Sequence, residues 1–345
     1  MRHGGDEFDV VLEALAADRL TEFGAPGVRI DVVRRIDGPF SAVRHVRIRT
    51  PTSTKHAYIK IAKAGEDRED QARAGRTLER EFRATLAFHA ALRQDEEFGA
   101  VRAVAWLPEH RALVTEEVSG RPFGHVLRTE ACVTDELRGI ARRVGRWVHL
   151  YQQTGEPGKA LEVRECREYL DTRLRFLVSR VISPGERRAA LDEFDRFAAE
   201  LDTRTLDRVP IHADLTPTNI IVGDRGRVTV LDFTMAQTGT LHHDLSHVYF
   251  HIELMARRHP RRRDLLRALQ QAVLSGYDPG LTAAHPLFRM MLLQHGACHV
   301  AQLAERRLPL IDAAYRWFMR HRWRLCEQMV GHGQRSGRHQ EAVTG

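Results

Sequence analysis

Polar and apolar positions alternate along several short runs in the first third of the chain, and this pattern predicts β-strands. The five predicted strands cover residues 28–36, 41–50, 56–63, 101–107 and 112–118. Between the third and fourth strands, residues 76–94 carry apolar side chains at helical spacing, which predicts one amphipathic helix. A further helical pattern covers residues 7–22. We therefore predict that the first third of the chain forms a small antiparallel sheet that carries one helix, with a helical extension before the sheet.

The pattern changes near residues 115–122, after which helical spacing dominates. Predicted helices cover residues 135–153, 167–180, 185–202, 243–258, 262–276, 287–307 and 312–330. Short strand-like runs interrupt these helices around residues 211–233. We therefore predict an α+β protein in which residues 1–118 form a small N-terminal lobe and residues 119–345 form a larger, mainly helical C-terminal lobe.

The composition is typical of a globular protein, because 43% of the 345 residues are hydrophobic and 29% are charged. No apolar run approaches the roughly 18 residues that a membrane-spanning helix needs, and the start of the chain lacks the apolar core of a signal peptide. The four cysteines lie far apart and form no C-x-x-C pair, which is typical of a reducing compartment. We therefore expect a cytoplasmic protein that makes no stable association with membranes.

Arginine has largely replaced lysine in this sequence. Lysine occurs only at positions 55, 60, 63 and 159, and asparagine occurs only at position 219. A lysine or asparagine that is retained against this bias is more informative than usual. The formal net charge of +7 lies entirely within residues 234–345, which contain 15 arginines and 8 acidic residues. No recognised nucleic-acid-binding motif accompanies this charge, so we expect no nucleic-acid partner.

The segment IHADLTPTNIIVGDRGRVTVLDF, residues 211–233, places acidic and amide side chains between short apolar runs. An enzyme that transfers a phosphoryl group must orient a hydroxyl group and hold Mg²⁺ across the phosphates. Asp214 can accept the proton of the hydroxyl, while Asn219 and Asp232 offer the oxygen ligands that Mg²⁺ prefers. The competing interpretation is an ordinary turn sequence in which His212 is a buried structural histidine.

This segment resembles the catalytic segment of the aminoglycoside phosphotransferase and choline kinase-like family, which is related to the protein kinases. Protein kinases have H-R-D-x-x-x-x-N at this place, and Ala213 instead of arginine points to the branch that acts on small molecules. The resemblance covers roughly residues 30–330. It implies a protein-kinase-like fold, ATP or GTP as the phosphoryl donor, Mg²⁺ as cofactor and a small-molecule hydroxyl acceptor. The site residues that it implies here are Asp214 and His212 as catalytic residues and Asn219 and Asp232 as metal ligands.

The same resemblance extends to a lysine and a glutamate of the N-terminal lobe. Lys60 in AYIKI resembles the strand lysine that binds the α- and β-phosphates of ATP, and Lys63 is its competitor. Glu81 in LEREFRATLAFH resembles the helix glutamate that pairs with this lysine. Glu79 is nearly as good a candidate, and either glutamate can instead be an exposed helix charge.

Two further parts of the N-terminal lobe are implied to bind the nucleotide. The strand-turn-strand that should cover the phosphates, IDGPFSAVRHV, lacks the G-x-G-x-x-G pattern, but Ser41 can still donate a hydrogen bond to a phosphate. The segment LVTEEVSGRPF resembles the connection between the lobes of the family, where backbone groups of Glu116, Glu117 and Val118 are expected to bind adenine.

Asp244 in HHDLSHV resembles a carboxylate that braces the catalytic loop in the family, and a helix N-cap is the alternative. The neighbouring pairs His243–His247 and His247–His251 have the i, i+4 spacing of metal ligands on a helix. No third acidic or thiol ligand is placed to complete a site, so we expect surface or supporting roles for these histidines.

The acceptor is expected to contact the second lobe, whose last part carries the positive charge. Aminoglycosides are polycations that favour acidic pockets, so the charge favours a neutral or anionic sugar-like metabolite or antibiotic over a polycationic aminoglycoside. The arginine-rich run 257–263 can recognise an anion, or it can be a solvated surface. Residues 315–330 of the last predicted helix mix tryptophan with arginine and are expected to pack on the core; the alternatives are stacking on a sugar ring or lying on an acidic membrane.

Two alternative functions are compatible with the same fold. One is a catalytically silent regulator that binds nucleotides, and the other is an aminoglycoside kinase of antibiotic resistance. The first is disfavoured because Lys60, Asp214, Asn219 and Asp232 are all present. A protein kinase is disfavoured because the chain between Asp232 and Asp244 is too short for a long activation loop.

Overall fold

The computed structural model describes residues 29–305 except for positions 39–40, 65–66, 156–157, 179 and 204, together with positions 8, 10–12, 15, 320, 323–324 and 328. The chain forms two compact units. Unit 1 comprises Met1–Arg121 and Ile221–Ala236, and unit 2 comprises Pro122–Ile220 and Gln237–Gly345. Most of the predicted helices at 7–22 and 315–330 lies outside the described residues. The predicted division of roles between the two lobes stays a prediction.

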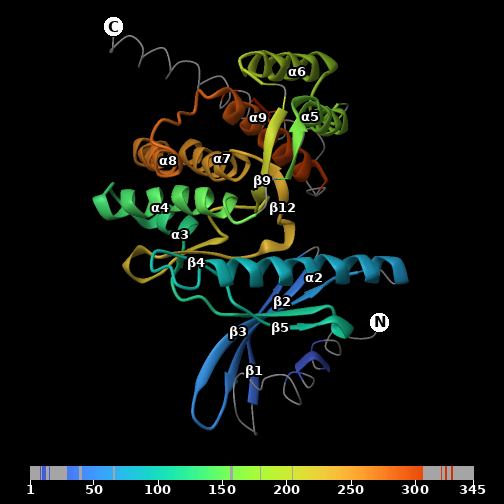
Figure 1. Ribbon diagram of the computed structural model, residues 1–345, viewed down its shortest axis with the longest axis vertical. Coiled ribbons are helices and arrows are strands. Elements are labelled where there is room, and N and C mark those ends of the chain that lie inside the picture. Colours follow the sequence, from blue (N-terminus) through green and yellow to red (C-terminus); the bar gives the residue numbers. More distant parts are fainter. Residues whose placement is uncertain are drawn as a thin grey trace. The chain divides into compact units, whose positions relative to one another are not determined.

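Unit 1 is built on a five-stranded antiparallel sheet with the order β1-β2-β3-β6-β5 (Figure 1). The strands of this sheet are β1 (Arg29–Asp37), β2 (Ser41–Arg49), β3 (Thr54–Ala62), β5 (Ala103–Leu107) and β6 (Ala112–Glu116). In β3, buried Ala57, Ile59 and Ile61 alternate with partly exposed residues. These three residues belong to one apolar core on one face of the sheet. Because successive strand residues point to opposite faces, Lys60 lies on the other face of the sheet.

Helix α2 (Arg68–Ala91) packs against β5 and β6, where Leu78 joins Leu113 in a small apolar cluster. Its N-cap is Asp67, whose carboxylate accepts a hydrogen bond from the backbone N–H of Asp70. The remaining elements of unit 1 are β4 (Phe98–Ala100), η3 (Pro108–His110), β10 (Ile220–Val222), η4 (Asp224–Gly226), β11 (Val228–Val230) and η5 (Phe233–Met235). Strand β11 pairs with β4, while β10 and the short β7 (Arg121–Pro122) complete this second sheet at the points where the chain passes between the units.

Gly120 lies just before β7 and has a φ of +140°, which only glycine adopts easily. A Cβ at this position would lie 2.4 Å from the backbone oxygen of Val222, so no larger residue fits without a shift of the backbone. This glycine therefore allows the segment after β6 to approach β10 closely.

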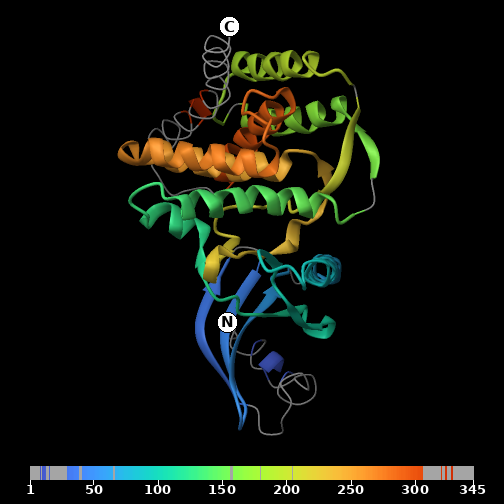
Figure 2. The same cartoon turned by 60° about the vertical axis from the view of Figure 1, so that its left-hand side comes forward.

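Unit 2 is mainly helical (Figure 2). Its elements are α3 (Phe123–Thr129), α4 (Asp135–Gln152), β8 (Gly158–Glu162), α5 (Val163–Leu177), α6 (Pro184–Ala199), β9 (Thr205–Ile211), β12 (Gln237–Thr240), α7 (His243–Arg258), η6 (Pro260–Arg262), α8 (Arg263–Tyr277) and α9 (Pro286–Glu305). Helices α4 and α8 pack closely because Gly145 on α4 faces the backbone of Val273, and Gly276 on α8 faces the backbone of Arg142. Residues of α5, α6, α7 and α9 share the main core of this unit.

The predicted α+β fold, with an antiparallel sheet and one helix followed by a helical region, is confirmed. The three-stranded sheet β12-β9-β8 was not predicted. Among the described residues, no helix combines the length and the apolar character needed to cross a membrane.

Candidate active site

Lys60 is the centre of a polar network in unit 1. Its ammonium group donates to both carboxylate oxygens of Glu81 at 3.0 Å and to Oδ1 of Asp232 at 2.8 Å. Thr234 Oγ1 lies 2.5 Å from the same ammonium group, and 2.7 Å from Oε2 of Glu81. The structure therefore brings together three of the residues proposed from the sequence, Lys60, Glu81 and Asp232.

The two carboxylates of this network differ in exposure. The Glu81 side chain is 4% exposed and that of Lys60 is 17% exposed, whereas the Asp232 side chain is 43% exposed. Burial alone lowers the pKa of Lys60, but the charges of Glu81 and Asp232 outweigh this effect and raise it overall. The Lys60 side chain therefore keeps its positive charge. Burial raises the pKa of Glu81, and the negative charge of Asp232 adds to this, whereas the Lys60 ammonium opposes it.

Three elements hold this network in place. Lys60 lies on β3 and Glu81 on α2, and Asp232 is the residue before η5. The ring of Phe233, which is fully buried, stacks on Phe88 of α2 with a centroid distance of 5.3 Å. Asp232 has a φ of 63°, in the left-handed region that non-glycine residues seldom adopt and that is common at functional sites. The stacked ring thus fixes η5 on α2, next to Glu81.

The competing residues Glu79 and Lys63 have other partners than the Lys60 network. Glu79 pairs with Arg83 on the exposed side of α2, at 2.6 Å. Lys63 donates to the carbonyl of Gly38, at 2.7 Å, in the turn between β1 and β2. Ser41 is the first residue of β2 beyond this turn, and its carbonyl accepts from the N–H of Gly38 at 2.9 Å.

The segment of residues 116–118, which begins at the last residue of β6 and was predicted to bind adenine, is partly engaged in the sheet. The N–H of Glu116 donates to the carbonyl of Arg102, and the N–H of Glu117 donates to the carbonyl of His56, both at 3.0 Å. These two N–H groups therefore already donate hydrogen bonds within unit 1. A nucleotide base that bound at this segment would form hydrogen bonds with the carbonyl groups of the segment and with the N–H of Val118.

The segment between β9 and β10 forms a compact loop in unit 2 around Asp214 and Asn219. The amide nitrogen of Asn219 donates to the carbonyl of Asp214 at 2.9 Å, and lies 3.4 Å from its carboxylate oxygen Oδ2. The N–H of Thr216 also donates to the carbonyl of Asp214, at 2.8 Å. The loop therefore holds the carboxylate of Asp214 next to the side chain of Asn219.

Asp244 fixes the start of this loop. Its carboxylate is fully buried and accepts from the N–H of His212 at 2.6 Å and from the N–H of Ala213 at 2.9 Å. Ala213 has a φ of 62°, so the backbone turns sharply just before Asp214. Asp244 lies in the first turn of α7, where a negative charge is favourable, but its bonds go to the loop. The side chain of His212 is fully buried, and its Nδ1 lies 3.4 Å from the N–H of Asp214.

The sequence did not indicate a role for Thr234, which contacts every charged member of the Lys60 network. The only signal in the sequence for this role is that Thr234 follows Asp232 by two residues. A hydroxyl group so close to Asp232 in the chain can reach Lys60 as well.

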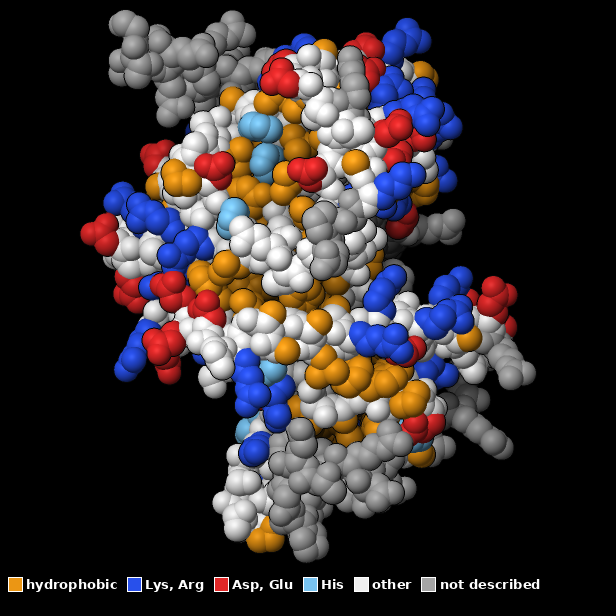
Figure 3. Space-filling view, viewed as in Figure 1, with side chains coloured by type: hydrophobic (Ala, Val, Ile, Leu, Met, Phe, Trp, Pro, Cys, Tyr) orange, Lys and Arg blue, Asp and Glu red, His pale blue; other side chains and the backbone are white. Residues whose placement is uncertain are grey.

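The arginine-rich run 257–263 is partly structural. Arg257 pairs with Glu253 of α7 at 2.9 Å, and Arg262 donates to the backbone carbonyls of Arg128 and Glu130. On the face drawn in Figure 3, arginine and lysine side chains are interspersed with acidic ones. The positive charge of this run is therefore only in part available to a ligand.

Comparisons with known proteins show the family and the fold of the chain. A family model described as the phosphotransferase enzyme family (APH) matches residues 46–287. No curated protein sequence matches the chain. Solved structures match it at low sequence identity, so they show the fold alone.

Three of these structures illustrate the match. Macrolide 2'-phosphotransferase MphH from Brachybacterium faecium is 17% identical, with 92% of this chain and 98% of that chain covered and a TM-score of 0.55. Choline kinase LicA from Streptococcus pneumoniae is 11% identical, with 94% and 99% covered and a TM-score of 0.55, and it has also been solved with AMP. An aminoglycoside 2'-phosphotransferase-IIIa mutant with bound GDP is 11% identical, with 93% and 98% covered and a TM-score of 0.58. The chain has the kinase-like fold and belongs to the APH phosphotransferase family, which confirms the predicted family and the predicted class of enzyme.

Proposed function

We propose that this protein transfers the γ-phosphoryl group of ATP or GTP, with Mg²⁺, to a hydroxyl group of a small molecule in the cytoplasm. The pairing of Lys60 with Glu81 and Asp232 carries this proposal, because a charged lysine held by a buried glutamate is what a triphosphate site needs. The nucleotide complexes of similar folds, one with GDP and one with AMP, support a nucleotide as the donor.

Lys60 is proposed to bind the phosphates of the nucleotide, and Glu81 to hold its ammonium group in position. Glu81 is suited to a positioning role because its carboxylate is almost completely buried and lies 3.0 Å from the lysine. Ser41 and the segment Glu116–Val118 are proposed to contact the phosphates and the base respectively.

Asp232 and Asn219 are proposed to hold Mg²⁺. Their donor groups fit this ion, which prefers hard oxygen ligands and keeps several waters. The side chain of Asp232 is 43% exposed, so its carboxylate is accessible to an ion. The amide nitrogen of Asn219 is used within the loop, and its oxygen is the atom that can bind a metal. A bound Mg²⁺ would neutralise charge on the phosphates.

Asp214 is proposed to accept the proton of the acceptor hydroxyl. The loop around it is held by Asn219 on one side and by Asp244 on the other, so its carboxylate has a fixed place to meet the hydroxyl. His212 was predicted as a catalytic residue, but its side chain is fully buried, so we propose that it supports the loop from within and does not contact the substrate.

The acceptor is proposed to be neutral or anionic, such as a sugar-like metabolite or antibiotic. The net charge of +7 over residues 234–345 disfavours a polycation. Since Arg257 and Arg262 are engaged in the fold, recognition of an anion would fall to the other arginines.

An assay of ADP and GDP release tests this function. The purified protein would be given MgATP or MgGTP and a panel of macrolides, sugars, nucleosides, choline and aminoglycosides, with phosphorylated product identified by mass spectrometry. We expect phosphate transfer to at least one neutral or anionic hydroxyl compound and none to the aminoglycosides. Nucleotide binding without transfer to any compound would favour the silent regulator. Efficient phosphorylation of an aminoglycoside would overturn the proposed acceptor class.

A further inference from the structure

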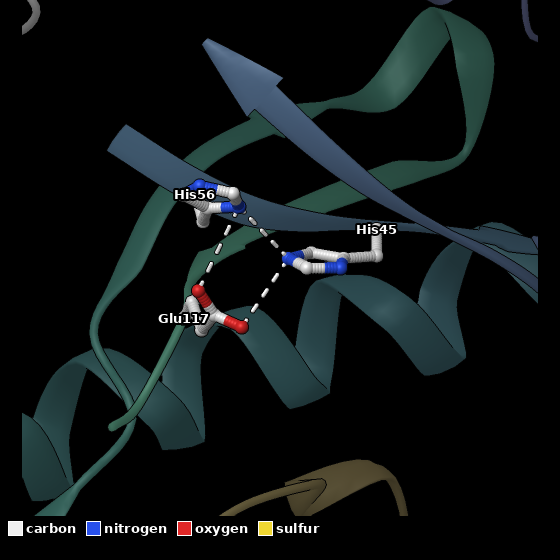
Figure 4. Close-up of side chains that lie close together, drawn as sticks. All are labelled: His45, His56 and Glu117. Atoms are coloured by element: carbon white, nitrogen blue, oxygen red, sulfur yellow. Dashed lines mark hydrogen bonds and ion pairs between the residues drawn. The ribbon is translucent and has the colours of Figure 1, made fainter. Parts of the chain in front are cut away.

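Three side chains that bind metals well converge on the sheet of unit 1. His45 lies on β2, His56 on β3, and Glu117 directly follows β6, and these three strands are neighbours in the sheet. Figure 4 shows the three side chains pointing toward one another. One ligand atom of each lies within 4.8 Å of the other two, and no other trio of His, Cys or acidic residues in the described part of the chain does so.

The distances between these atoms fit a tetrahedral metal ion. Zn²⁺ binds histidine nitrogen and carboxylate oxygen at about 2.0–2.2 Å, so two ligand atoms of a tetrahedron lie about 3.3–3.5 Å apart. His56 Nδ1 and His45 Nε2 are 3.2 Å apart, and His45 Nε2 and Glu117 Oε1 are 3.3 Å apart. The second oxygen of Glu117 lies 3.8 Å from His56 Nδ1. Two of these three distances thus match the separation that one shared ion requires, and the third is a few tenths of an ångström longer.

Hydrogen bonding alone explains this arrangement poorly. A ring nitrogen of histidine carries at most one hydrogen, yet His45 Nε2 is approached by both His56 and Glu117. The two distances, 3.2 Å and 3.3 Å, lie at or just beyond the long end of the roughly 2.7–3.2 Å that is usual for N–H···O bonds. An ion placed between the three atoms would satisfy all of them at once.

The surrounding sheet holds the three ligands in place. The ring of His45 stacks on Tyr58, its direct neighbour on β3, with a centroid distance of 4.7 Å and an interplanar angle of 16°. The N–H of Glu117 donates to the carbonyl of His56 at 3.0 Å, which extends the pairing of β3 with β6 by one residue. Such supporting contacts reduce the cost of ordering the ligands when an ion binds.

The cluster is accessible to an ion from solvent. The side chain of His45 is 14% exposed, while those of His56 and Glu117 are each 36% exposed. Three protein ligands leave one position for water, which is the arrangement of an open zinc site. Two imidazoles and one carboxylate favour Zn²⁺ over Mg²⁺, which prefers oxygen ligands.

We propose that His45, His56 and Glu117 form a Zn²⁺-binding site on the β2-β3-β6 sheet of unit 1. This site shares no ligand with the Mg²⁺ site proposed for the phosphotransfer reaction, although Glu117 also belongs to the segment whose backbone is proposed to contact the nucleotide base. Zn²⁺ therefore would bind whether or not the protein has phosphotransferase activity.

Titration of tag-free protein with Zn²⁺, without nucleotide or Mg²⁺, tests the site. Isothermal titration calorimetry would compare the wild type with Glu117→Gln, which removes a negative ligand but keeps its shape, and with His45→Ala/His56→Ala. His125→Ala serves as the matched control, since His125 is an exposed histidine on α3. Thermal unfolding and circular dichroism of each variant would show that it is folded.

We expect the wild type to bind one equivalent of Zn²⁺ that the double variant lacks, and Glu117→Gln to weaken this equivalent by at least about tenfold. His125→Ala should leave it unchanged. Co²⁺ added to the wild type should give the visible absorption of a tetrahedral ion, and Zn²⁺ should displace it. Equal stoichiometry and affinity in the wild type and in folded Glu117→Gln protein would overturn the proposal.

Discussion

Buried histidines in unit 2 should make the protein sensitive to mild acid. Burial, followed by the neighbouring His285, lowers the pKa of His242 to about 3. Burial, followed by the charge of Arg258, lowers the pKa of His251 to about 4. His247 and His295 stack at 4.5 Å, and burial together with their histidine neighbours lowers the pKa of both well below the usual value.

These pKa shifts fix the sign and the size of the effect. In the unfolded chain histidine has a pKa of about 6.5. Between pH 6.5 and pH 4 the unfolded state therefore binds protons that the folded state does not bind. The folded state is therefore fully favoured above pH 6.5, and its stability falls as the pH decreases. For His251 or His242 the loss at pH 5 is about 2 kcal/mol each, against a total stability of about 5–15 kcal/mol for a typical protein.

The perturbation is a series of pH values between 7.5 and 5.0, applied to the wild type and to His251→Gln. Urea unfolding followed by tryptophan fluorescence gives the midpoint at each pH. Below pH 6.5, each buried histidine should make the free energy of unfolding fall by up to about 1.4 kcal/mol per pH unit. The free energy of unfolding of His251→Gln should therefore depend less steeply on pH than that of the wild type. Exposed His125→Gln is the control and should keep the slope of the wild type. Parallel pH dependence in wild type and His251→Gln would refute the reasoning.

Two substitutions test the proposed active site. Asp214→Asn keeps the shape of the side chain and removes the proton acceptor, so kcat should fall by about 10²–10⁴-fold while the Kd for nucleotide, measured by calorimetry, stays the same; an unchanged kcat would exclude Asp214 as the base. Glu81→Gln should weaken the hold on Lys60 and lower kcat/KM by about 10–100-fold, whereas Glu79→Gln, which loses only an exposed pair with Arg83, should retain wild-type kinetics; equal losses in both would contradict the assignment of Glu81.

Local patterns were sufficient to predict most of the fold. The predicted helix at 76–94 and the predicted strands at 41–50 and 56–63 correspond to α2, β2 and β3 because alternation and helical spacing are visible within a few residues. The sheet β12-β9-β8 was missed because its strands are short and pair over long sequence separations. Tertiary pairing of this kind leaves no local signal.

The candidate site was predictable to the extent that residue type and spacing carry its chemistry. Lys60 and Asp232 are 172 residues apart in the chain, and only the family resemblance suggested that they meet. Helical spacing places Glu81, and not Glu79, on the same face of α2 as Leu78, so the choice between the two glutamates was available from the pattern of the helix. The cluster of His45, His56 and Glu117 gave no signal, because it depends on the register of three strands.

The Lys60 network allows its structural and catalytic parts to be separated. Lys60→Met leaves the buried Glu81 carboxylate without its cation, and breaking such a buried pair costs about 3–5 kcal/mol. Part of this cost is avoided when Glu81 takes up a proton, so the deficit in stability should grow as the pH rises above about 4.3, the usual pKa of a glutamate. Lys60→Met/Glu81→Met removes both charges, and Thr234 can then donate to Asp232. Urea midpoints should therefore recover most of the lost stability in the double variant, while phosphotransferase activity stays absent from both. A double variant that is no more stable than Lys60→Met would mean that burial of Glu81 is not the source of the cost, and that the lysine supports the fold in another way.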